Sequence, residues 1–298
     1  MQKSYQQLIE KLGEDRVKID ELMSLHTTFK IGGPADLFYE AKTEEEVAES
    51  IKFCQNLEIP FFVLGGGSNL LVSDKGIRGM VIKISNIKYQ ISNTIITADA
   101  GARLGDIVEA AAEHSLSGLE FAVGIPGTLG GALRGNAGAW QQAIGDRVLR
   151  VRILDKDIKV KWISKKDCQF DYRQSRFKKS GEIILAAELK LLSGNPEQIR
   201  ETMRDNLEKR KSQPREPSAG SIFINPKPEA AGALIEQVNL KGFCVGQAQI
   251  SPQHANFIIN LGGASCSDVL ELISLAKKAV EEKFGIKFEE EVKIVGEF

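Results

Sequence analysis

The sequence lacks the features that mark several large classes of protein. Its four cysteines are scattered, form no C-x-x-C pair and have no histidine at the spacing of a zinc site. We therefore expect reduced, mostly buried thiols, as in a cytoplasmic protein, and no metal site. No hydrophobic run approaches the length of a membrane span, and the polar amino-terminal segment lacks the apolar core of a signal peptide.

An excess of charge of either sign is also missing. The 298 residues carry a formal net charge of −1 although 27% of them are charged. We therefore expect no nucleic-acid partner and no membrane association, and any phosphate site must be local. A chain of this length is expected to form about two domains.

The common nucleotide-binding motifs are absent as well. There is no Gly-Lys dipeptide and hence no Walker A loop, no G-x-G-x-x-G spacing and no G-x-S-x-G elbow. A nucleotide or cofactor site must therefore use a different kind of glycine-rich segment.

Two segments are candidates. In the first, the apolar run Phe61–Leu64 predicts a buried strand, and a turn of three glycines, a serine and an asparagine follows it, Gly65 to Asn69. Bare backbone amides beside short polar side chains suit a pyrophosphate, although a plain tight turn between strands is the alternative. The second segment, Val123–Ala139, places its glycines among small apolar residues, which favours backbone packed against something flat or bulky over a flexible linker.

Periodicity and capping signals predict alternating helices and strands. Thr43 is expected to cap a helix, with Glu46 completing a capping box, and Asn195-Pro196 is expected to open another. Gln213–Pro217 is interpreted as an interdomain hinge, and residues 218–228 as a loop. The further helices are expected near residues 4–12, 104–114, 229–238 and 267–284, and the strands near 36–41, 61–64, 79–84, 95–98, 148–154, 160–163, 183–192, 247–250, 254–260 and 290–295.

Polar residues outside the glycine segments supply candidate chemistry. Ser221, pinned between prolines in P-S-A-G-S-I-F-I-N-P, is either part of a plain turn or a rigidly held proton donor. Arg173, beside Tyr172 in D-Y-R-Q-S-R-F, suits a carboxylate or phosphate, the alternative being an ordinary loop salt bridge. Glu291 ends a run of three glutamates at the entry to a strand, where one carboxylate can point inward. His254 is a weaker candidate.

Six motifs, in one order along nearly the whole chain, resemble the UDP-N-acetylenolpyruvoylglucosamine reductase family. They are T-F-K-I-G-G (28–33), G-G-G-S-N-L-L-V (65–72), G-I-P-G-T-L-G-G-A (124–132) with N-A-G-A (136–139), D-Y-R-Q-S-R-F (171–177), P-S-A-G-S-I-F-I-N-P (217–226) and E-E-V-K-I-V-G (290–296). The resemblance implies an α+β fold. An FAD-binding domain in two lobes, of the vanillyl-alcohol-oxidase type, would occupy residues 1–212, and an α/β substrate-binding domain would occupy residues 213–298.

The resemblance also implies an activity. NADPH would reduce FAD, which would reduce the enolpyruvyl ether of a UDP-sugar to UDP-N-acetylmuramate. The enzyme would be a cytoplasmic monomer that acts in peptidoglycan precursor synthesis. Arg173, Ser221 and Glu291 match the family's catalytic residues, and Asn225, Arg215 and Gln253 are assigned to the substrate. The residues assigned to FAD are Gly65, Gly66, Gly67, Ser68, Asn69, Ile125, Pro126, Gly127, Thr128, Gly130, Gly131, Ala132 and Asn136.

Two departures from the family pattern stand out. Tyr172 is the last tyrosine of the chain, so the tyrosine-bearing lid of longer relatives is missing. Ile224 stands where relatives are expected to carry a basic residue, and Arg215 or Lys211 is the expected substitute. The competing hypotheses are an FAD-dependent oxidase of the same fold and a flavin- or nucleotide-binding module without turnover.

Overall fold

The computed structural model describes residues 3–298, and its chain divides into two compact units. Unit 1 comprises the residues up to Val17, together with Phe38–Gly66 and Met80–Arg210. Unit 2 comprises Lys18–Leu37, Gly67–Gly79 and Lys211–Phe298. Among residues 3–298, no helix is long and apolar enough to cross a membrane.

The amino-terminal part of unit 1 is built on two helices, α1 (Lys3–Leu12) and α2 (Glu44–Asn56), which contact each other. Thr43 caps α2 as expected, its hydroxyl accepting the amide of Glu46 at 3.2 Å. The carboxylate of Glu46 completes no capping box with Thr43, because it accepts the amide of Lys42 and both terminal nitrogens of Arg16. A four-stranded sheet has the order β1-β2-β5-β3, with β1 Val17–Leu22, β2 Pro34–Ala41, β5 Ile77–Ile84 and β3 Phe61–Leu64.

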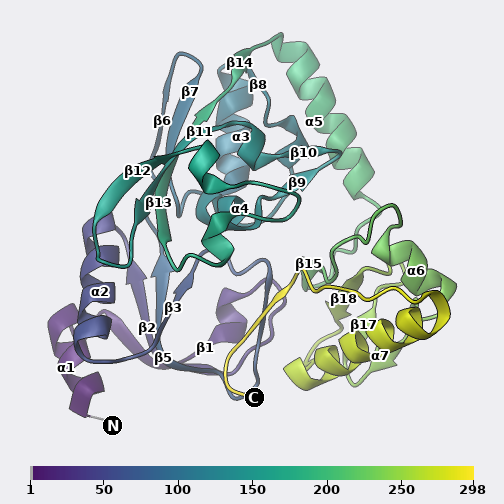
Figure 1. The fold of residues 1–298 in the computed structure, drawn as a ribbon, viewed down its shortest axis with the longest axis horizontal. Coiled ribbons are helices and arrows are strands. Elements are labelled where there is room, and N and C mark those ends of the chain that lie inside the picture. Colours follow the sequence, from purple (N-terminus) through teal and green to yellow (C-terminus); the bar gives the residue numbers. More distant parts are fainter. Residues whose placement is uncertain (1–2) are drawn as a thin grey trace. The chain divides into compact units, whose positions relative to one another are not determined.

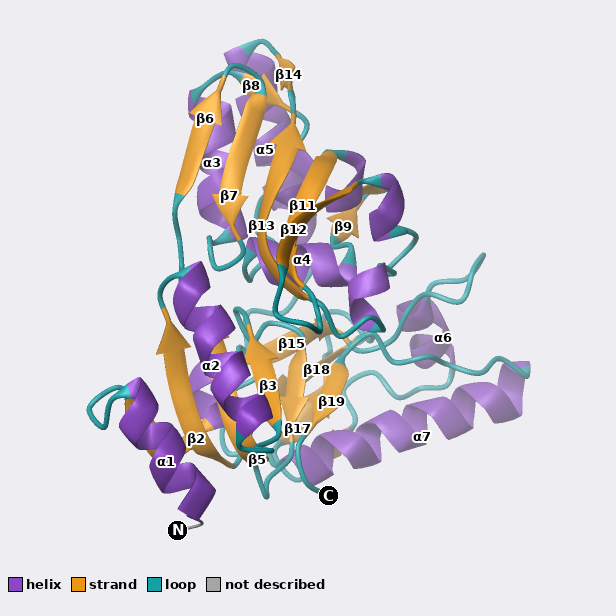
Figure 2. Ribbon diagram, turned by 60° about the vertical axis from the view of Figure 1, so that its left-hand side comes forward, coloured by secondary structure: helices purple, strands orange, loops and turns teal. Residues whose placement is uncertain are grey.

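The rest of unit 1 is an antiparallel five-stranded sheet with the order β12-β11-β13-β7-β6. Figure 2 shows helices α3 (Leu104–Glu113) and α5 (Pro196–Arg210) together on one face of this sheet. Helix α4 (Leu129–Gly135) contacts β13 and β7. The strands are β6 Tyr89–Ser92, β7 Ile95–Asp99, β11 Val148–Leu154, β12 Val160–Ser164 and β13 Ile183–Lys190, and short pairs are formed by β8 Leu116–Ser117 with β14 Leu192–Ser193 and by β9 Gly138–Ala139 with β10 Gln142–Ala143.

The carboxy-terminal part of unit 2 is a four-stranded sheet, β15-β18-β17-β16, beside the helices α6 (Ala231–Gln237) and α7 (Cys266–Phe284) (Figure 1). Helix α7 starts with a capping box between Ser265 and Asp268, and Asp74 accepts the amides of Cys266 and Ser267. Strand β4 (Leu70–Val72) pairs in parallel with β19 (Lys293–Val295). The other strands are β15 Ser218–Ser221, β16 Cys244–Val245, β17 Ala248–Ile250 and β18 Phe257–Asn260.

The core of unit 2 draws on segments that are far apart in the sequence. Phe29, Ile31 and Leu71 are buried in one cluster with Ile222, Phe223 and the inner face of α7. The glycine-rich loop that contains Phe29 and the strand that follows the glycine turn are therefore integral parts of this unit.

Two sequence-based expectations about elements were wrong. Residues 218–221 were expected in a loop but form strand β15, because Ser218 and Ser221 pair with Ile259 and Phe257 of β18. The expected strand at 254–260 begins only at Phe257, since the preceding residues turn around the hydroxyl of Ser251, which accepts the amide of Gln253 at 3.1 Å.

Candidate active site

The two glycine-rich segments meet in unit 1. A Cβ added to Gly66 would lie 2.7 Å from Cα of Gly127, and one added to Gly65 would lie 2.7 Å from the hydroxyl of Thr128. Glycine is required here because the two backbones approach more closely than side chains allow. Gly66 and Gly131 are exposed, so the backbone of both turns can be reached from outside.

The second turn leads into helix α4. The hydroxyl of Thr128 caps this helix by accepting the amide of Gly131, and the amides of Leu129 and Gly130 donate to the carbonyls of Ala102 and Ala100. A Cβ on Gly130 would lie 2.9 Å from Cβ of Ala100. The turn is therefore fixed from behind, and its exposed side is backbone with few side chains. Such a bare surface fits the flat ring system of FAD, which needs close approach, and the amide donors for its pyrophosphate would come from the first turn, Gly65–Asn69.

Asn136 has a different role from the glycines around it. It is buried and takes a left-handed conformation at the end of α4 (φ 45°). Its side-chain oxygen accepts a hydrogen bond from the backbone amide of Gly145 at 3.0 Å. Its amide nitrogen donates to the carbonyl of Asp171 at 2.8 Å. Asn136 therefore holds the tight turn Asp171–Gln174, which carries Arg173.

Arg173 lies half-buried in this turn with a left-handed backbone (φ 53°). Its Nη2 donates to the carbonyl of Gly138 at 2.9 Å, and its guanidinium lies 5.4 Å from the ring of Tyr172. Arg176, in the same motif, forms a two-pronged ion pair with Glu182 at 2.9 and 2.8 Å. The two arginines thus differ in these contacts: Arg176 forms an ordinary structural salt bridge with Glu182, and Arg173 donates to the backbone carbonyl of Gly138.

The hairpin beside Arg173 turns through Trp140 and Gln141, both in the left-handed region (φ 48° and 64°). Glycine or asparagine is usual at such positions. The ring of Trp140 lies 4.8 Å from the guanidinium of Arg210 and 5.4 Å from Nζ of Lys209. Burial and the nearby charge of Arg173 lower the pKa of Arg210, which also donates to the carbonyl of Val123 at 2.7 Å.

Ser221 ends strand β15 in unit 2. The pairing of β15 with β18 shifts register between Ser218 and Ser221, at Gly220, whose φ is +76°. A bulge of this kind re-aims the side chain that follows it. The next residues are clamped by the buried Asn256, which accepts the amide of Phe223 at 3.0 Å and donates to its carbonyl at 2.9 Å.

Glu291 lies beside Ser221 in the same unit. Its amide donates to the carbonyl of Ile222 at 2.8 Å, Ile224 donates to Glu289 at 2.9 Å, and Phe223 and Glu290 form a bridge. The structure therefore brings together two residues that the sequence separates by seventy positions, on adjacent and hydrogen-bonded segments.

The residues assigned to substrate are less closely grouped. Asn225, Arg215 and Gln253 are all exposed in unit 2. The side-chain oxygen of Asn225 accepts the amide of Ala231 at 2.9 Å and so helps to start α6. Next to Gln253, His254 is half-buried, and burial lowers its pKa.

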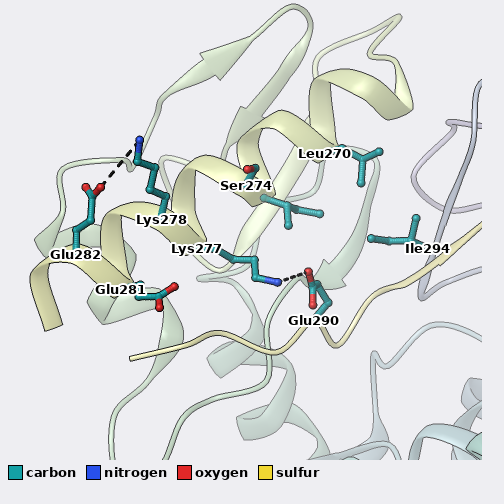
Figure 3. Close-up of a pocket in the computed structure, with 9 residues that line it drawn as sticks. Leu270, Ser274, Lys277, Lys278, Glu281, Glu282, Glu290 and Ile294 are labelled. Carbon is teal, nitrogen blue, oxygen red and sulfur yellow. Dashed lines mark hydrogen bonds and ion pairs between the residues drawn. The ribbon is translucent and has the colours of Figure 1, made fainter. Parts of the chain in front are cut away.

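A groove of about 720 Å³ lies along α7 (Figure 3). Its floor includes Leu270, Ile273 and Ile294, and an ion pair between Lys277 and Glu290 crosses it at 2.8 Å. Of the described residues that line the groove, none is a predicted site residue. The groove is lined by both apolar and charged residues and contains neither Ser221 nor Glu291, so it gives no reason to place the active site elsewhere.

Sequence reasoning missed the side chains that hold these segments. Asn256 clamps the residues after Ser221, and the amide nitrogen of Asn260 donates to the carbonyl of Phe29 at 3.1 Å. Thr28 donates its hydroxyl to the carbonyl of Ser218 at 2.7 Å. Only Thr28 lay in a motif that the sequence singled out.

Two family models match most of the chain between them. A family model described as an FAD binding domain matches residues 35–164. A second model, described as the C-terminal domain of UDP-N-acetylenolpyruvoylglucosamine reductase, matches residues 213–295. The fold and the glycine cradle thus define an FAD-binding oxidoreductase.

Relatives that match over nearly the full length of the chain identify the family within this class of oxidoreductases. The chain is 45% identical over 293 residues to the UDP-N-acetylenolpyruvoylglucosamine reductase of Caldanaerobacter subterraneus subsp. tengcongensis, covering 97% of both chains. It is 42% identical over 297 residues to the protein of that name from Clostridioides difficile, covering 98% of both chains. The solved reductase from Thermus caldophilus superposes with a TM-score of 0.82 at 36% identity, covering 94% of this chain and 98% of that one.

The chain belongs to the UDP-N-acetylenolpyruvoylglucosamine reductase family. The predicted family, the α+β fold class and the FAD cofactor are therefore confirmed. Alkyldihydroxyacetonephosphate synthase, 17% identical with a TM-score of 0.50 over 63% of this chain, shares the fold alone.

Proposed function

We propose that this chain uses NADPH and bound FAD to reduce UDP-N-acetylglucosamine enolpyruvate to UDP-N-acetylmuramate, a step in peptidoglycan precursor synthesis. The observation that supports the proposal is the hydrogen bond of 2.8 Å from the amide of Glu291 to the carbonyl of Ile222, the residue after Ser221, because this bond joins the segments that carry the glutamate and the serine. An oxidase of the same fold has no need of a proton donor at this position.

FAD would be held by the two glycine turns. The bare backbone of Gly65–Asn69 and of Ile125–Ala132 would form the cradle. When bound, FAD supplies the electron chemistry, taking a hydride from NADPH and giving it to the terminal carbon of the enolpyruvyl group. The protein's contribution is to bind, to orient and to move one proton.

The proton and the developing charge are assigned to three residues. As the terminal carbon gains a hydride, negative charge develops on the neighbouring carbon and its carboxylate. Arg173 would stabilise this charge, with most effect where water is excluded. The hydroxyl of Ser221 would then give its proton to the neighbouring carbon, which completes the addition of two hydrogens across the double bond. Glu291 would orient the intermediate or share its proton.

The remaining assignments follow from the same proposal. Asn225, Arg215 and Gln253 would contact the UDP-sugar, and with Ile224 apolar, Arg215 or Lys211 would supply a cation for its diphosphate. We assign residues 1–212 to FAD binding and 213–298 to substrate binding. Because all four cysteines are free thiols, we place the enzyme in the cytoplasm, and we expect a monomer.

Anaerobic stopped-flow absorbance tests the proposal. NADPH should bleach the flavin band, and UDP-N-acetylglucosamine enolpyruvate should restore it quickly. The Ser221→Ala variant should bleach normally and recover at least about 100-fold more slowly. Ser218→Ala, three residues earlier on the same strand, is the matched control and should recover at the wild-type rate. Recovery with oxygen but not with the sugar would instead establish an oxidase.

A further inference from the structure

Thr28 connects the glycine turn to the strand that carries Ser221. Its amide donates to the carbonyl of Gly67 at 3.2 Å, and its hydroxyl donates to the carbonyl of Ser218 at 2.7 Å. Thr28 belongs to the T-F-K-I-G-G motif, for which the proposed reaction has no direct use. Thr28 thus bonds to two separate segments, and Ser218 lies 190 residues further along the chain.

The loop around Thr28 is itself firmly held. The hydroxyl of Thr27 donates to the carbonyl of Ile31 at 3.1 Å, and Phe29 is completely buried. Gly67 has a φ of +64°, and a Cβ there would lie 2.0 Å from the carbonyl oxygen of His26. The glycine turn therefore packs closely against this loop at Gly67. Thr28, in the same loop, fixes the distance between the turn and Ser218 through its two hydrogen bonds.

Asn69, at the other end of the same turn, contacts the glutamate segment, Glu289–Val292. Its side-chain nitrogen donates to the carbonyl of Glu291 at 3.0 Å, and its own carbonyl accepts the amide of Lys293 at 3.1 Å. The amide of Glu291 is already bonded to Ile222 at 2.8 Å. With hydrogen bonds on both peptide planes that flank Cα of Glu291, φ and ψ are fixed and so is the direction of the Cα–Cβ bond.

We propose that the glycine turn sets the positions of Ser221 and Glu291 through two positioning residues, Thr28 and Asn69. The inference rests on the proposed function. Residues 67–69 of the turn, the strand that carries Ser221 and the segment that carries Glu291 would thereby keep fixed positions within unit 2. A small error in these positions is costly, because catalysis is sensitive to displacements of about 1 Å.

The test compares Thr28→Val, which removes the hydroxyl at nearly constant shape, with Thr28→Ser, which keeps it. Asn69→Ala is the second variant, and since Asn69 is exposed this change should leave folding intact. In Thr28→Val and Asn69→Ala we expect kcat with the enolpyruvyl sugar to fall about 10-fold. In Thr28→Val, KM and the rate of flavin reduction by NADPH should stay within about twofold, and Thr28→Ser should recover most of the loss.

Hydrogen–deuterium exchange gives a readout that does not depend on activity. The amides of residues 289–293 should exchange faster in Asn69→Ala, and those of residues 218–222 faster in Thr28→Val. The FAD content of Thr28→Val should stay at the wild-type level. Wild-type kcat and wild-type exchange in both variants would overturn the inference, as would an equal loss in the NADPH step of Thr28→Val. If the wild-type enzyme itself does not turn over the sugar, the proposed function fails. The exchange data still decide whether Thr28 and Asn69 hold the two segments.

Discussion

The guanidinium of Arg173 donates a hydrogen bond of 2.9 Å to the backbone carbonyl of Gly138. Gly138 begins the hairpin strand β9, and the turn that carries Arg173 is tied to the same region by Asn136. The arginine assigned to charge stabilisation is therefore held by the second glycine-rich segment, Val123–Ala139.

Replacing Arg173 by Lys should slow the reduction of the enolpyruvyl sugar by roughly 100-fold, because an ammonium cannot reproduce the geometry of the planar guanidinium. Flavin reduction by NADPH should change by less than about threefold. Arg176→Lys is the matched control. It disrupts the ion pair with Glu182 and should lower the melting temperature while keeping the rate. Equal rate losses in both variants would remove the special role of Arg173.

Gly66→Ala should impair FAD binding. The added Cβ would lie 2.7 Å from Cα of Gly127, so one glycine turn must move, at a cost of roughly 1–3 kcal/mol. The ratio of bound FAD to protein, from absorbance, should fall. Gly135→Ala in α4 meets nothing within 4 Å, and it should keep FAD and raise the stability by about 0.5–1 kcal/mol. Full FAD content in Gly66→Ala would show that the turns do not form the cradle.

Thiol alkylation should label one cysteine quickly and three slowly. Cys244 is exposed, whereas Cys54, Cys168 and Cys266 are buried. Burial raises the pKa of each of these three thiols to about 12, so little thiolate is present at pH 8. Mass spectrometry after iodoacetamide treatment should find the label on Cys244 first and on all four cysteines only after denaturation. Early labelling of Cys266 would contradict the burial of the first residue of α7.

The ion pair between Arg16 and Glu46 should make stability depend on pH in acid. The hydrogen bonds from Arg16 lower the pKa of Glu46 below its ordinary value of 4.5. A carboxyl with a lowered pKa in the folded state stabilises the protein above its ordinary pKa and loses this contribution as the pH falls through the folded value. Glu46→Gln should therefore cost about 1 kcal/mol at pH 7, a figure that allows for partial exposure, and progressively less below pH 4.5. Urea unfolding at several pH values measures this difference. A constant difference across the range would contradict the shift.

The sequence predicted the start of a helix correctly where a single capping residue was enough to define it. Thr43 and Asn195 cap their helices as predicted, the oxygen of Asn195 accepting the amides of Glu197 and Gln198. Strand β15 was missed because Ser-Ala-Gly-Ser has no preference for a strand, and only its pairing with β18 makes it one. Strands β1 and β6 were missed because their sequences, VKIDEL and YQIS, are mostly exposed and polar.

The candidate site was predictable to a different degree. The glycine turns and the residues Arg173, Ser221 and Glu291 were selected by motif, and their roles remain predictions. Thr28 and Asn69 lie in motifs and Asn256 does not, but the part that all three play in holding these segments could not be found in this way. Thr28, Asn69 and Asn256 bond to backbone atoms of distant residues, and a backbone carbonyl leaves no trace in the identity of the residue that carries it.

The aromatic contacts of unit 1 provide an optical probe. The chain has two tryptophans, and both lie in this unit beneath cations, Trp140 under Arg210 and Lys209 and Trp162 under Arg150 at 4.4 Å. Intrinsic tryptophan emission therefore reports on unit 1 alone, and the unit that carries Ser221 and Glu291 is silent in such a measurement. Melting followed by emission and melting followed by circular dichroism will coincide only if the two units unfold together.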